Sequence, residues 1–115
     1  MSDAEEPPHA DRRRKCRRRV LLGGVISTRD GAQCLPCSIR SLSEKGARIA
    51  TPRSQTIPAD IFLIIIRDQV AHEAEVAWRN PKETGLVFRK AYQLSELEDP
   101  KLVHLKNLWQ AHAAR

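Results

Sequence analysis

The chain has 115 residues, of which 41% are hydrophobic and 30% charged, a balance typical of one small globular domain with a single core. Its longest apolar run, residues 61–66, is too short to cross a bilayer, and three cysteines are too few for a disulfide framework. The acidic N-terminus lacks the apolar stretch of a signal peptide, so we expect a cytoplasmic protein without membrane insertion.

The positive charge is concentrated in residues 11–19, whose sequence is DRRRKCRRR. Removing its seven basic residues from the 20 in the chain leaves 13, against 14 acidic ones, so the remainder is nearly neutral. A block of like charges stays solvated or disordered until an anion binds, and arginine donates paired hydrogen bonds to phosphate. The run therefore predicts a phosphate-bearing partner, although composition alone also fits a basic tail that binds any polyanion weakly. Residues 1–11 are expected to be a disordered leader.

Short segments with strand character follow the run and are separated by turn signals. Asp30 and Gly31 mark a hairpin, and residues 41–46 form a polar turn that ends in glycine. Residues 61–66 are apolar on both faces, which predicts a central strand. The six expected strands are residues 20–28, 33–40, 47–51, 59–67, 70–79 and 85–88.

This pattern predicts an all-β fold, a six-stranded antiparallel barrel over residues 12–92 that includes the arginine segment. The C-terminal segment, residues 93–115, changes to a helical period. Asp99 followed by Pro100 indicates a helix start, so we expect a helix over residues 100–113. Its apolar stripe should dock on the barrel or on a partner. The stripe consists of Leu102, Leu105, Leu108, Trp109 and His112.

Two short motifs follow one another along the chain, one in the arginine run and one in the polar turn. The run contains an R-x-x-x-R spacing, and residues 41–46, SLSEKG, resemble a [D/N]-x-S-x-x-G turn with serine in the first place. Residues 76–79, VAWR, and residues 85–88, GLVF, follow. Together these segments resemble a PilZ domain, the bacterial receptor family for cyclic di-GMP, over residues 12–88.

The resemblance implies roles for the arginines. Arg13 and Arg17 match the residues that grip the ligand's phosphates and stack on guanine. Arg12 resembles the residue before the motif in members that take a stacked pair of ligands. Arg14 and Arg18 have the same spacing as Arg13 and Arg17, so the register of the motif stays open.

The second motif implies three more ligand-binding residues. Ser43 and Gly46 match the positions that line the guanine edge, and Ser41 takes the place of the family's aspartate or asparagine. A hydroxyl there accepts hydrogen bonds from guanine less well than a carboxylate does. Trp78 lies where family members often contact the ligand, but it shares a face with Ala74 and is expected in the core.

No pattern predicts catalysis, a cofactor or a metal site. Cys34 and Cys37 form a C-x-x-C pair, which suits zinc or redox chemistry, but only Cys16 is available as a third thiol. Positions three apart in a strand face opposite sides, which disfavours a shared metal or redox site. We therefore expect both to be buried cysteines that act as small core residues. The four histidines have no metal-binding spacing.

These features predict a cyclic di-GMP receptor that relays the ligand level to an unidentified downstream protein when its arginine segment becomes ordered. One alternative is a PilZ-like domain that has lost ligand binding and acts as a protein-interaction module. The other is a nucleic-acid-binding protein that uses the arginine run. The aromatic content of 4%, without a clustered stacking platform, disfavours nucleic acid as a partner.

Overall fold

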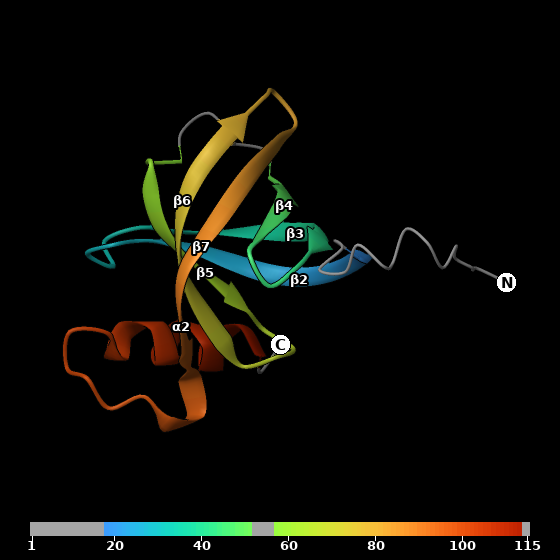
Figure 1. Ribbon diagram of the computed structural model, residues 1–115. Helices are drawn as coiled ribbons and strands as arrows, with labels where there is room; N and C mark the ends of the chain where they lie inside the picture. Colours follow the sequence, from blue (N-terminus) through green and yellow to red (C-terminus); the bar gives the residue numbers. More distant parts are fainter. Residues whose placement is uncertain (1–17, 52–56, 114–115) are drawn as a thin grey trace, which may run out of the picture.

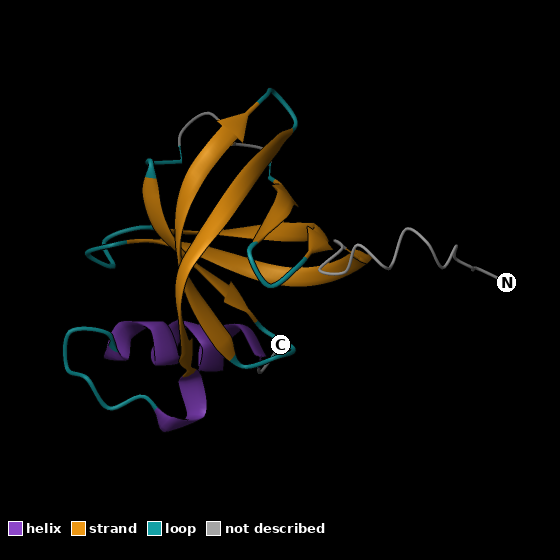
Figure 2. Cartoon of the chain, in the orientation of Figure 1, coloured by secondary structure: helices purple, strands orange, loops and turns teal. Residues whose placement is uncertain are grey.

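The structure is a computed structural model that describes residues 18–51 and 57–113. Within these residues, six antiparallel strands form a closed barrel in the order β2-β3-β4-β7-β6-β5 (Figure 1). A short 3-10 helix, η2, and the C-terminal helix α2 follow the last strand, as Figure 2 shows. The predicted fold, a six-stranded antiparallel barrel with one C-terminal helix, is confirmed. The elements are β2 (Arg18–Thr28), β3 (Cys34–Leu42), β4 (Gly46–Ala50), β5 (Asp60–Ile65), β6 (Val70–Arg79), β7 (Glu83–Gln93), η2 (Leu94–Glu96) and α2 (Val103–Ala113).

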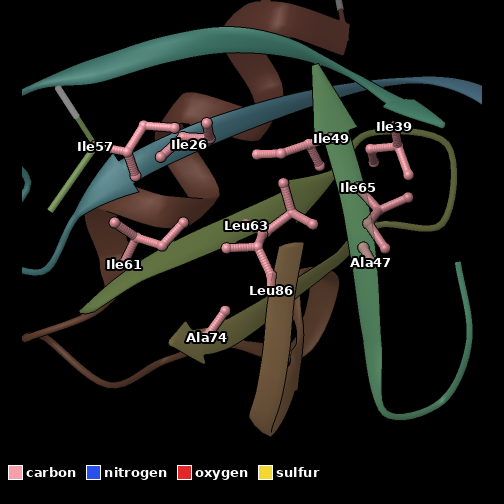
Figure 3. Packing of buried hydrophobic residues seen from close by; sticks show 10 residues of the cluster. All are labelled: Ile26, Ile39, Ala47, Ile49, Ile57, Ile61, Leu63, Ile65, Ala74 and Leu86. Carbon is pink, nitrogen blue, oxygen red and sulfur yellow. The ribbon is translucent and has the colours of Figure 1, made fainter. Parts of the chain in front are cut away.

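Aliphatic side chains fill the barrel interior (Figure 3). They come from alternate positions of the strands, because successive side chains of a strand point to opposite faces. In β5, Ile61, Leu63 and Ile65 face inward. Figure 3 labels the ten buried members of this cluster: Ile26, Ile39, Ala47, Ile49, Ile57, Ile61, Leu63, Ile65, Ala74 and Leu86.

The outward side chains of β5 are buried as well, because the C-terminal segment covers them. Phe62 and Ile64 belong to a second cluster that includes Leu94 of η2 and Leu105 of α2. Trp109 of α2 donates its Nε1 hydrogen to the carbonyl of Ile66, with the two atoms 3.2 Å apart. Residues 61–66 were predicted to form a central strand because both of their faces are apolar. Residues 61–65 do form a strand, but a closed barrel has no central strand, so that part of the prediction is wrong. The run is apolar on both faces because one face fills the barrel and the other contacts the C-terminal cluster.

Trp78 is 43% exposed, so its predicted place in the core is wrong. The register shifts between Val76 and Trp78, because the β6–β7 ladder pairs Val76 with Leu86 and Trp78 with Gly85. This bulge breaks the alternation that the sequence suggested and turns Trp78 to the outside. A Cβ atom on Gly85 would lie 2.1 Å from Nε1 of Trp78, so the indole lies directly over this glycine.

Two elements differ in length from their predictions. β7 extends to Gln93, well beyond residue 88, because its second half pairs with the start of β6, where Val70 faces Gln93. The residues of this half are mostly exposed and polar, so the sequence lacks the apolar alternation that would predict a strand there. α2 begins at Val103, because Asp99 forms a tight turn first: its carboxylate accepts from the Lys101 amide at 2.9 Å.

We expect Thr84→Val to raise the free energy of unfolding by about 1 kcal/mol or more. Thr84 is fully buried, and its hydroxyl has no hydrogen-bond partner among the described residues. Valine keeps the shape of the side chain and removes the unsatisfied group. Urea unfolding of the two proteins measures the difference.

Thr51→Val is the matched control. Thr51 is also buried, but its hydroxyl donates to the carbonyl of Pro36 at 3.3 Å, so this variant should lose about 1 kcal/mol instead. Equal shifts from the two substitutions would contradict the assignment of Thr84 as an unsatisfied group.

Candidate functional site

The start of β2 and the end of β3 lie side by side (Figure 1). Arg18, the first residue of β2, has Leu42 as its Cα partner, and Arg19 has Ser41. The last two residues of the arginine run therefore lie beside the first two residues of the second motif. All three predicted site residues of the run lie outside the described residues: Arg12, Arg13 and Arg17.

Ser43 holds the β3–β4 turn in shape. Its amide donates to the carbonyl of Gly46 at 2.9 Å. Its hydroxyl oxygen accepts from the amides of Lys45 at 3.2 Å and Gly46 at 3.3 Å. A serine that satisfies two backbone donors of its own turn has a structural role there, whatever the turn binds.

Gly46 is required by the close approach of β7. A Cβ atom at this position would lie 2.1 Å from the carbonyl oxygen of Leu86. The amide of Phe88 also donates to the carbonyl of Lys45 at 2.7 Å, which ties β7 to the turn. The serine and glycine of the motif thus fix one rigid turn at the end of the barrel.

Ser41 lies in β3 and is only 4% exposed, so the expectation that it belongs to an open polar turn is wrong. The strand continues to Leu42 because both neighbouring strands pair with it there. The Cα partners of Ser41 are Arg19 on β2 and Arg48 on β4. The part of the motif that reaches solvent is therefore the tip of the turn, which begins after Leu42.

A strip of outward positions runs across the barrel from Ser41. Arg48 pairs with Gly85, and Gly85 pairs with Trp78. These positions face outward because their neighbours Ala47 and Leu86 fill the interior. Arg48 forms a 3.4 Å ion pair with Glu83. The strip brings an arginine and an exposed indole to the same face as Ser41, an arrangement that strand alternation alone did not predict for Trp78.

A hollow of about 450 Å³ opens between the β3–β4 turn and the β5–β6 turn. Leu42, Ile65 and Ala91 contribute to its apolar wall. Its polar lining comes from Ser43, Glu44, Arg67 and Asp68. Sequence reasoning missed this hollow, because its walls come from distant parts of the chain that carry no shared motif.

His72 lies in the wall of the hollow and stacks on Phe88, with ring centroids 3.8 Å apart and planes inclined by 7°. Burial lowers its pKa to about 4, and the Asp68 carboxylate opposes that shift only in part. The imidazole is therefore neutral at pH 7, so the wall presents an uncharged aromatic surface.

The cysteines do not form a site within the described chain. Cys37 packs against the barrel core, and burial raises the pKa of its thiol to about 12. Cys34 is exposed, so the expectation that both cysteines are buried is wrong for this residue. Both thiols are free, and residues 18–51 and 57–113 contain no group of three His, Cys, Asp or Glu residues placed to hold a metal ion.

The family model described as the PilZ domain matches residues 11–108, which include both motifs and all six strands. The chain belongs to the PilZ family. PilZ domains are receptor domains without enzymatic activity and generally bind cyclic di-GMP. No individual curated protein matches the chain. In the part of this PilZ domain that the structure describes, no helix is long and apolar enough to cross a membrane.

We expect Gly46→Ala to lower the free energy of unfolding by about 2–3 kcal/mol in the absence of any ligand, since the new methyl group meets the backbone of β7. Gly23→Ala is the matched control, because a Cβ atom there would meet only Cδ1 of Ile66 at 3.8 Å. Thermal or urea unfolding compares the two. Equal stability of both variants would show that β7 can move away from β4.

The folded protein should lose stability as the pH falls from about 6.5 towards 4. Below pH 6.5 the unfolded chain takes up a proton at His72 that the folded protein, with a pKa of about 4 there, resists. We expect His72→Gln to flatten this part of the profile. Urea midpoints at pH 7, 5.5 and 4.5 measure it. An unchanged slope in the variant would contradict the assignment to His72.

Proposed function

We propose that this PilZ domain is a cytoplasmic receptor that binds cyclic di-GMP at the end of the barrel where the arginine run meets the β3–β4 turn. The observation that carries the proposal is the pairing of Arg18 with Leu42. It brings the last residues of the arginine run, Arg18 and Arg19, next to the strand end that leads into the S-x-x-G turn, although more than twenty residues separate the two motifs along the chain. Neither motif alone would argue for a nucleotide.

The charge distribution supports a ligand with phosphates. The formal net charge of +6 is due to the arginine run, whereas the described barrel neutralises several of its charges in local pairs, such as Arg48 with Glu83 and Arg67 with Asp68. The two phosphodiesters of cyclic di-GMP suit arginine guanidinium groups, which donate paired, charge-assisted hydrogen bonds.

The nearby surface supports the binding of planar bases. The strip across the outer face carries the exposed indole of Trp78, and the hollow presents the stacked ring of His72. Both offer flat surfaces on β6, which is joined to the β3–β4 turn through β7 and β4.

We propose further that the ligand fixes the arginine segment against the barrel, and that a partner protein reads the resulting surface. We expect no rearrangement of the core, because the side chains of the barrel interior and of the C-terminal cluster are already buried without ligand. Amide exchange should therefore slow in residues 12–17 on addition of cyclic di-GMP and stay unchanged in residues 61–66, whereas Arg18 and Arg19 already belong to β2. Protection of residues 12–17 before ligand is added would contradict this mechanism.

The second candidate is a PilZ domain that does not bind the nucleotide and acts as a protein-interaction module. Ser41 favours it, since a buried hydroxyl takes the place of the family's aspartate or asparagine. Calorimetry with cyclic di-GMP, GTP and a random oligonucleotide separates the candidates. Binding of cyclic di-GMP alone supports the receptor, and no binding of cyclic di-GMP supports the interaction module. Equal binding of all three indicates a plain polyanion tail.

Arg17→Ala should weaken cyclic di-GMP binding about tenfold or more, because a charge-assisted hydrogen bond contributes about 1.5–3 kcal/mol. Arg18→Ala is the matched control: it removes the same charge from the adjacent position and should have a smaller effect. Titration calorimetry measures both. Equal losses would show that the register of the motif is shifted or that only bulk charge counts.

A further inference from the structure

We infer that the carboxylate of Glu44 accepts hydrogen bonds from a guanine base of the bound nucleotide, and that this base lies in the hollow beside the β3–β4 turn. This inference rests on the proposed function and assigns the acceptor that the motif lacks at Ser41. Glu44 belongs to the same turn but is not one of the motif's defining positions.

Ser41 is poorly placed to accept from a base. It lies in β3 between two paired strands and is 4% exposed. Its hydroxyl also lacks the negative charge that strengthens a hydrogen bond from guanine. The acceptor must therefore come from another residue at this end of the barrel if guanine is to be recognised by its donors.

Glu44 is exposed at the tip of the turn and lines the hollow. Within residues 18–51 and 57–113 its carboxylate has no ion-pair partner, whereas Asp68 in the same lining is paired with Arg67 at 2.7 Å. The turn that carries Glu44 is rigid, because Ser43 accepts from two of its amides. Of the two carboxylates at the hollow, Glu44 is thus the one available to a ligand.

The hollow suits a single base. Its volume of about 450 Å³ lies in the range of small-molecule pockets, about 300–1,000 Å³. Leu42 offers an apolar contact to the face of a ring, and His72, stacked on Phe88, adds an aromatic one. The remainder of the ligand can then extend over the rim towards the start of β2, which pairs with the end of β3.

The chemistry of the carboxylate selects guanine over adenine. Guanine presents N1–H and the N2 amino group side by side, so the two oxygens of Glu44 can accept from both. Adenine presents a lone pair at N1, which a carboxylate repels, and loses one of the two bonds. A site that accepts from two donors of guanine binds adenine less well, because the second oxygen of the carboxylate then faces a lone pair instead of a donor.

The experiment is titration calorimetry of the full chain and of Glu44→Gln with cyclic di-GMP and cyclic di-AMP. We expect the variant to bind cyclic di-GMP about tenfold more weakly or worse, with cyclic di-AMP unchanged or improved, so that the preference for guanine collapses. Glu98→Gln is the matched control, since it removes the same charge from an exposed site in the loop between η2 and α2. Thermal midpoints check that both variants are folded.

The outcomes separate the two levels of the argument. A wild-type chain that binds neither nucleotide overturns the proposed function, and the role of Glu44 with it. A wild-type chain that binds cyclic di-GMP, together with a Glu44→Gln variant that keeps both the affinity and the guanine preference, overturns the role of Glu44 alone. Equal losses from Glu44→Gln and Glu98→Gln would also overturn it, because they indicate an effect of net charge.

Discussion

The close contact between β4 and β7 at Gly46 is the constraint on which the candidate site depends. Here the backbone of β7 passes so near to β4 that no side chain fits, and the amide of Phe88 reaches the carbonyl of Lys45. This contact closes one side of the barrel and holds the β3–β4 turn at its end. The orientation of Ser43 and Glu44 towards the hollow follows from it, because the turn has little freedom of its own.

The β5–β6 turn links the hollow to the C-terminal segment. Two of its residues, Arg67 and Asp68, line the hollow. Its carbonyls also anchor the C-terminal elements: the amide of Leu94 donates to Gln69 at 2.8 Å, and the indole of Trp109 donates to Ile66. One short segment therefore borders the candidate site and supports η2 and α2, which cover the outer face of β5.

The charges of the chain are arranged in two different ways. In the described barrel, several arginines are neutralised by nearby carboxylates, as Arg29 is by Glu73 at 2.9 Å while it lies over the Phe62 ring. The arginine run instead concentrates like charges at the start of β2. Mutual repulsion within such a block is relieved by a polyanion, so the excess charge supports the proposal of a ligand with phosphates.

The sequence alone determined the barrel, the approximate strands, the C-terminal helix and the family. Alternation, turn residues and motif order can be recognised in the sequence without knowing which strands pair with one another. It also singled out residues 41–46 as a turn, because serine and glycine are typical turn residues.

The tertiary structure alone decided which way Trp78 points, how deeply Ser41 is buried, and that Glu44, Asp68 and His72 line one hollow. Each of these depends on strand register. A single bulge reverses the faces of every residue beyond it, and pairing brings together segments that no local pattern connects. The position of a bulge depends on the pairing of both complete strands, so the few residues around it do not predict it.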